Sequence, residues 1–145
     1  MTADKSLEDV ARQRSQLGDA MHQVEEAAAA PAAMESWAAD LSIQLRNLET
    51  AFDQHIVEAQ SPTGILNQVV DQAPRLQNAA EHLKREDTRL AKSIDDIIEV
   101  AATGTADVSI DLRESVMEVL VDLARHRQQG ADLLYEAYAV DIGGY

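Results

Sequence analysis

Apolar residues recur at alternating steps of three and four along four segments of this 145-residue chain. This spacing places them on one face of an α-helix, whereas the apolar residues of a half-buried strand occupy every second position. The four series are Leu7, Val10, Leu17, Met21 and Val24, with Arg14 at the intervening step; Trp37, Leu41, Leu45, Leu48, Phe52 and Ala59; Leu76, Ala80, Leu83, Leu90, Ile94 and Ile97; and Leu112, Val116, Val119, Leu123, Leu133, Ala137 and Val140. Each apolar face needs another to cover it, so the pattern predicts four helices that pack together.

Turn signals separate the four segments. Pro31 ends the first helix, a Ser-Pro-Thr-Gly turn over 61–64 follows the second, and a Thr-Gly-Thr connection over 103–105 precedes the fourth. A long coiled coil is the alternative arrangement of such helices. Three breaks in a short chain favour a closed bundle instead, because each break lets the next helix fold back on the previous one.

We therefore predict an all-α, up-down-up-down four-helix bundle that forms a single domain over 1–145. Ser6 has the position of an N-cap for the first helix. A short helical piece over 65–71 precedes Pro74, where the third helix begins or kinks. The last helix is expected to end at the glycines before residue 145, which leaves 141–145 as a flexible tail.

The composition excludes several classes of protein. The chain has no cysteine, which excludes disulfides, thiolate chemistry and cysteine-based zinc sites. Its net charge of −14 would repel phosphate backbones, so no nucleic-acid partner is expected. No stretch approaches the ~20 apolar residues that span a bilayer, and the polar N-terminus lacks an apolar signal region. We expect a cytoplasmic protein without a membrane partner.

Besides Arg14 near the start of the first series, three positions within the apolar series carry polar side chains: His55, Asp87 and His126. An unpaired charge in a protein interior costs several kcal/mol, so such residues are hydrogen-bonded, paired, shifted in protonation or bound to a metal. Asp87 pairing with His126 across the bundle is one interpretation, and a shared metal ion is the other.

Helix geometry offers a crude test of whether these residues meet. At ~1.5 Å per residue, Asp87 lies roughly 20 Å along the third helix and His126 about 21 Å from the end of the fourth. His22 comes out at about 22 Å on the first helix, so these three side chains are predicted to share a layer. His55 lies near the end of its helix and is placed ~10 Å lower.

In these motifs the chain resembles the hemerythrin-like (HHE) cation-binding proteins. The motifs are His22 on the first helix, His55 with Glu58 on the second, the segment LKREDTRL over 83–90 on the third, and His126 followed by Asp132 on the fourth. The resemblance implies a four-helix bundle that holds a non-haem di-iron centre between its helices. It implies five candidate metal ligands: His22, His55, Glu58, Asp87 and His126.

The sequence departs from the pattern of that family at several ligand positions. Glu58 follows His55 by three residues where the family has four, and Ala59 occupies the family position. Asp87 and Ala91 stand where the family has a pair of histidines on the third helix. We therefore predict a divergent member with a reduced or lost metal site, and the sequence leaves open whether the site holds iron, zinc or no metal.

No enzymatic activity is expected, because the chain lacks the nucleophile elbow Gly-x-Ser-x-Gly and both glycine-rich phosphate-binding loops. The Glu-x-x-His pair of ferritin-like bundles is also missing.

Tyr135 and Tyr138 are spaced to lie on one flank of the fourth helix, where they either contact a partner or cap the bundle end. The alternative function is therefore an acidic helical interaction module, or a homodimer, without any metal.

Overall fold

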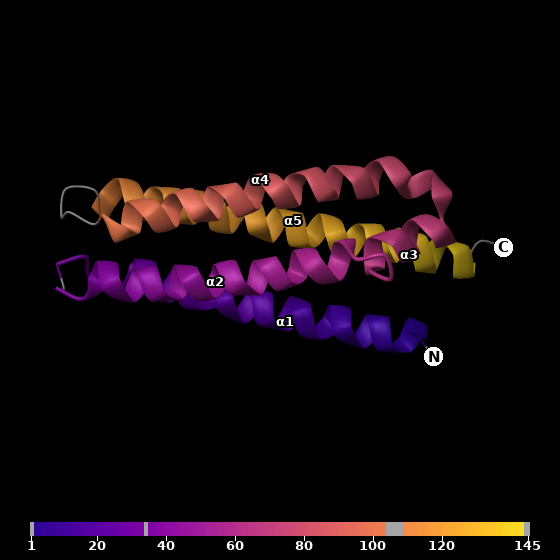
Figure 1. Cartoon of the computed structure of the whole chain (residues 1–145), viewed down its shortest axis with the longest axis horizontal. Coiled ribbons are helices and arrows are strands. Elements are labelled where there is room, and N and C mark those ends of the chain that lie inside the picture. The colour runs from indigo at the N-terminus through magenta and orange to yellow at the C-terminus, as the bar shows by residue number, and fades with distance from the viewer. Residues whose placement is uncertain (1, 34, 104–108, 144–145) are drawn as a thin grey trace.

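The computed structural model describes residues 2–33, 35–103 and 109–143 of the chain. Its elements are α1 (Thr2–Ala29), α2 (Trp37–Gln60), α3 (Ile65–Gln72), the 3-10 helix η1 (Pro74–Leu76), α4 (Gln77–Ala102) and α5 (Ser109–Gly143). These described residues contain no strand, and four of the helices are long, so the predicted all-α four-helix bundle is confirmed. Consecutive long helices run in opposite directions in Figure 1, which is compatible with the predicted up-down-up-down order.

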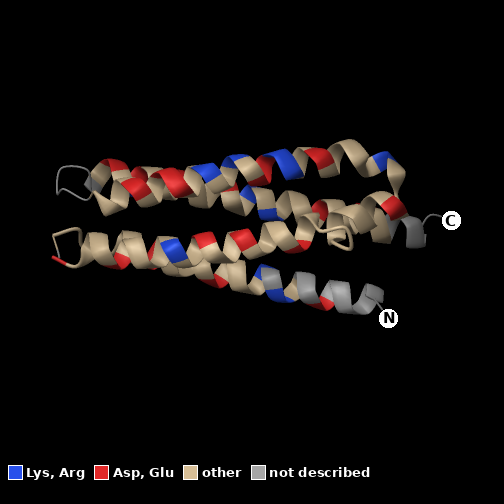
Figure 2. Ribbon diagram, in the orientation of Figure 1, with Lys and Arg blue, Asp and Glu red and all other residues tan. Residues whose placement is uncertain are grey.

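The four long helices close into a bundle because each packs on two others. α1 contacts α2, α2 contacts α4, α4 contacts α5, and α5 returns to α1. Every apolar residue of the four predicted series whose side chain is described is buried, apart from the half-buried Met21. The helical periodicity therefore identified the core correctly. Asp and Glu are spread along the coloured parts of all four long helices in Figure 2.

The start of the first helix differs from the prediction. α1 begins at Thr2, so Ser6 lies inside the helix and is not its N-cap. α5 ends at Gly143, the first of the two glycines expected to end it, so 141–143 of the predicted tail are helical. Residues 144 and 145, and positions 104 and 105 of the predicted Thr-Gly-Thr connection, lie outside the described residues.

A side chain from α5 holds the end of α1. The Arg113 guanidinium donates hydrogen bonds to the carbonyl oxygens of Ala28 at 2.7 Å and Ala30 at 2.9 Å. The Ala28 carbonyl belongs to the last turn of the helix and Ala30 follows that turn, and Pro31 prevents the helix from continuing to satisfy them. The same guanidinium lies 5.4 Å from the ring centroid of Trp37 at the start of α2. One arginine thus joins the α1–α2 corner to α5.

The connection between α2 and α3 requires a glycine. In the predicted turn, the Gly64 amide donates to the carbonyl of Ser61 at 2.8 Å. A Cβ atom added to Gly64 would lie 2.3 Å from the carbonyl oxygen of Glu58, which is backbone and cannot rotate away. Gly130 in α5 differs, because a Cβ added there would meet no atom within 4 Å.

These two glycines predict opposite effects of the same substitution. We expect Gly64→Ala to lower the free energy of unfolding by about 1–3 kcal/mol, since the methyl group displaces the end of α2. Gly130→Ala should raise it by up to about 1 kcal/mol, because alanine favours a helix over glycine. Urea unfolding followed by circular dichroism measures the free energy of unfolding of both variants. Equal effects of the two substitutions would contradict the difference in space around the two glycines.

Candidate metal centre

Three polar side chains from three helices meet inside the bundle: His55 of α2, Asp87 of α4 and His126 of α5. One potential ligand atom of each lies within 4.8 Å of the others. Asp87 and His126 are 1% and 3% exposed, and His55 is half-buried. The predicted pairing of Asp87 with His126 across the bundle is therefore confirmed, and His55 joins them although it was placed lower.

The three residues form a polar layer between two apolar clusters. The larger cluster ends near this layer at Phe52, Leu90 and Leu123, and the smaller cluster begins beyond it with Ala59, Leu83 and Leu133. The polar side chains thus occupy one level of the bundle core, with aliphatic packing on both sides.

His126 is held at both ring nitrogens. Its Nε2 lies 2.6 Å from Oδ1 of Asp87, and its Nδ1 lies 2.6 Å from Oε1 of Glu86. Two carboxylates accept hydrogen bonds from both nitrogens only when the ring is an imidazolium. Burial alone would lower the pKa of His126, but the hydrogen bond and charge of Asp87, with those of Glu86, raise it above its ordinary value.

Asp87 is engaged through both of its oxygens. Oδ1 faces His126, and Oδ2 accepts a hydrogen bond from Nε2 of Gln60 at 2.9 Å. Sequence reasoning missed Gln60 and Glu86 as members of this network. The only signal for Glu86 was its place beside Asp87, which is weak in a chain with 26 acidic residues.

His55 has a different environment. Its Nε2 lies 3.8 Å from Oδ1 of Asp87, which is too far for a hydrogen bond. Its ring stacks on Phe52 with centroids 5.6 Å apart. Burial lowers the pKa of His55, and the opposing charge of Asp87 does not restore it. The layer therefore pairs a neutral imidazole, which has a lone pair to offer a metal, with an imidazolium.

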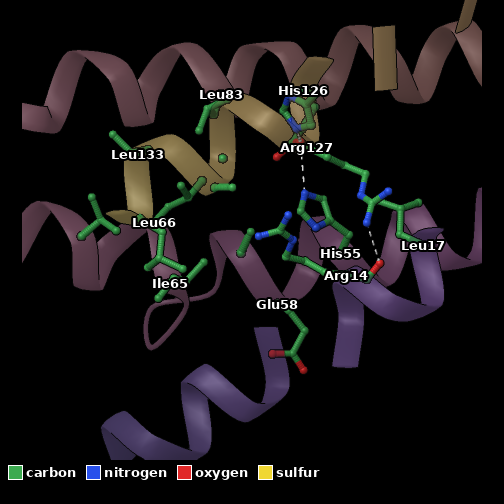
Figure 3. Close-up of a pocket in the computed structure, with 16 residues that line it drawn as sticks. Arg14, Leu17, His55, Glu58, Ile65, Leu66, Leu83, His126, Arg127 and Leu133 are labelled. Atoms are coloured by element: carbon green, nitrogen blue, oxygen red, sulfur yellow. Dashed lines mark hydrogen bonds and ion pairs between the residues drawn. The ribbon is translucent and has the colours of Figure 1, made fainter. Parts of the chain in front are cut away.

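Two predicted ligands do not join the layer. His22 is 64% exposed and pairs with Glu26 one turn along α1, at 3.0 Å. Its predicted place beside Asp87 and His126 is wrong, because position 22 faces away from the buried side chains of α1. Glu58 is exposed, and its carboxylate points away from His55 in Figure 3.

The predicted level of His55 is also wrong. The estimate from helix rise assumed that the end of α2 and the start of α4 lie at the same height, but α3 and η1 extend the bundle past the end of α2.

Of the two predicted interface residues, Tyr135 is 70% exposed. Tyr138 is half-buried and packs on the smaller apolar cluster.

Comparison with known proteins gave no match to a family model, a curated protein or a solved structure. The resemblance to hemerythrin-like proteins therefore stays a prediction from motifs. Within the described part of the chain, none of the helices is long and apolar enough to cross a membrane.

The charge on His126 makes the stability of the metal-free protein depend on pH. Its pKa in the folded state is raised above 6.5, so its stabilising effect is complete below pH 6.5 and is lost as the pH rises through the folded pKa. We expect the free energy of unfolding of the wild type to decrease as the pH increases from 6.5 through the folded pKa of His126. In His126→Gln this part of the pH dependence should disappear.

NMR titration of the ring protons provides the check on this assignment. The His126 ring should titrate above pH 6.5 and the His55 ring below it, since the pKa of His55 is lowered. Protonation of His55 favours the unfolded state, because its pKa is lowered by folding. Its effect therefore lowers the free energy of unfolding only as the pH falls below 6.5. A His126 ring that titrates below 6.5 would contradict the imidazolium.

Proposed function

We propose that this chain is a non-enzymatic helical-bundle protein that binds one divalent transition-metal ion through His55, Asp87 and His126. The observation that carries the proposal is the convergence of these three ligand atoms within 4.8 Å in the interior. Three converging ligands inside a helical bundle are what we expect of a hemerythrin-like protein with a reduced metal site. The cytoplasmic location expected from the sequence belongs to the same proposal.

The distances between the ligand atoms fit a metal ion after small movements. Bonds from zinc to nitrogen or carboxylate oxygen measure about 2.0–2.2 Å. Two ligand atoms on one ion therefore lie about 2.8–3.6 Å apart at octahedral or tetrahedral angles. The present separations of 2.6 Å from Asp87 to His126 and 3.8 Å from Asp87 to His55 bracket this range.

The neighbouring residues provide the outer contacts that metal ligands usually have. A histidine ligand commonly donates its second N–H to a carboxylate, which orients the ring. Glu86 is placed to accept that hydrogen bond from Nδ1 of His126, and Gln60 holds the outer oxygen of Asp87. Nε2 of His126 then faces the proposed ion, and the metal replaces the proton that this nitrogen shares with Asp87.

The ligand set favours zinc or iron(II). Imidazole nitrogens suit zinc and iron, and a carboxylate completes such sites, whereas calcium and magnesium prefer oxygen ligands alone. Three ligands are enough for one ion. They are fewer than the di-iron centre implied by the resemblance would require, which supports a reduced site.

Metal binding is tested on protein purified without a chelator and on the metal-free protein titrated with zinc, iron(II) or cobalt(II). We expect about one ion per chain, with affinity that rises with pH because the metal displaces a proton from His126. His55→Ala and His126→Ala should abolish binding. Glu86→Gln keeps the ligands and should weaken binding about 10–100-fold.

His22→Ala is the matched control, since it removes an exposed histidine outside the layer and should leave the affinity unchanged. The absorption spectrum of bound cobalt(II) reports nitrogen and oxygen ligation directly. Metal-free protein that takes up no ion at neutral pH would sink the proposal. Binding that survives in both histidine variants would sink it as well.

A second candidate function is self-association through the outward face of α5. Four large apolar side chains are exposed there: Ile110, Met117, Val121 and Tyr135. Their spacing is that of positions along one coiled-coil seam, which a helix of a second molecule would cover. This surface supports the homodimer alternative that the tyrosines indicated.

Light scattering over a range of protein concentrations tests self-association. We expect the wild type to form a dimer as the concentration rises and Val121→Lys to stay monomeric, because a charge in the seam costs more than the apolar contact it replaces. Arg125→Gln, a surface change on the same helix, is the control. A wild type that is monomeric at every concentration excludes this function.

A further inference from the structure

A cavity of about 80 Å³ lies beside the candidate metal centre (Figure 3). Its apolar wall is formed by Ala59, Leu66, Val69, Leu83, Leu133 and Leu134. Gly130 also borders it, and the absence of any atom within 4 Å of an added Cβ shows that the missing side chain leaves space there. The cavity is thus a product of α3, which lies across the end of α2, and of a glycine in α5.

Two arginines line the same cavity, and neither pairs with a described acidic side chain. Among the ion pairs of the described residues, Arg14 and Arg127 take part in none, although the chain has 26 acidic side chains and only 12 Lys and Arg. The Arg127 guanidinium donates to the Arg14 carbonyl at 3.1 Å. In Figure 3 the Arg14 guanidinium extends into the cavity beside His55.

The carboxylates on the lining do not neutralise Arg14. Asp87 is occupied by His126 and Gln60 through its two oxygens. Glu58 is exposed at the rim, and its side chain points away from the Arg14 guanidinium in Figure 3. Within the described part of the chain, this half-buried guanidinium therefore faces an apolar cavity without a counter-ion.

We propose that this cavity binds a small carboxylate anion with a short apolar tail. Guanidinium and carboxylate match in geometry, because the planar fork of N–H donors meets both carboxylate oxygens. Arg14 holds the anionic end near His55, and the tail lies against Leu66, Leu83 and Leu133. Because Arg14 is not one of the proposed metal ligands, this inference does not rest on metal binding.

The size of the cavity limits the tail. An engineered apolar cavity of about 150 Å³ holds benzene, so a cavity of about 80 Å³ takes a shorter group. The series acetate, propionate and butyrate adds one methylene at each step. Each methylene that enters the cavity should tighten binding about fourfold, and the gain should stop once the space is filled.

The test uses the full chain after the metal has been removed with a chelator and the chelator dialysed away. Calorimetry and methyl NMR follow titration with sodium acetate, propionate and butyrate. We expect saturable binding of propionate that shifts methyl signals of Leu66 and Leu133. Propionamide, the neutral analogue, should bind at least about tenfold more weakly, as should inorganic phosphate, which has no tail.

Variants locate the ligand. Arg14→Gln should weaken propionate binding about tenfold or more, since a charged hydrogen bond is lost. Arg125→Gln removes the same charge outside the cavity and should change nothing. Gly130→Met, which places an unbranched side chain in the cavity, should abolish binding while circular dichroism shows an intact fold. Glu58→Gln should leave the affinity unchanged or increase it.

Three outcomes would overturn the inference: no saturable binding of propionate, equal binding of propionamide, or unchanged affinity in Arg14→Gln and Gly130→Met. The result is separable from the metal experiment. Carboxylate binding by metal-free protein supports the cavity even if no metal is ever bound. A metal-binding chain that ignores propionate keeps the proposed function and loses this inference.

Discussion

The buried ion pair between Asp87 and His126 constrains the rest of the structure. A carboxylate that is 1% exposed is tolerated only when its charge is matched and its oxygens accept hydrogen bonds. His126 from α5 and Gln60 from α2 meet that requirement. Aliphatic seams of Leu and Ala accept more than one relative height of two helices, whereas hydrogen bonds do not. The polar layer therefore sets the register of three helices at once.

The same contacts that set the register are suited to a metal. Glu86 and Gln60 hold the outer atoms of His126 and Asp87, and the inner atoms are left facing His55. A proton lies between His126 and Asp87 in this charge pair. The proposed metal ion would take the place of that proton and would contact His55 as well.

The short helix α3 changes what a simple bundle offers. It covers the end of the core beyond α2, and the turn before it depends on the close approach of Gly64 to the carbonyl of Glu58. Together with Gly130, it leaves a cavity next to the polar layer. Arg14 then brings to an apolar wall a positive charge that pairs with none of the described carboxylates. These features give the described part of the bundle a cavity with both a charged and an aliphatic side.

The periodicity of the sequence was enough to identify the four long helices, their buried faces and the polar side chains within those faces. The reason is that the spacing of apolar residues along an amphipathic helix shows which side of it is buried. The same periodicity determined that Asp87 and His126 lie in the interior. Only the tertiary structure decided that His55 joins them and His22 does not. That outcome depends on how far each helix extends past its neighbours and how it is rotated, and α3 altered the height of α2. The roles of Glu86, Gln60 and Arg14 depend on contacts between helices that are distant in the sequence. The local pattern gave only weak signals for them: Glu86 lies beside Asp87, and Arg14 has the spacing of the first apolar series.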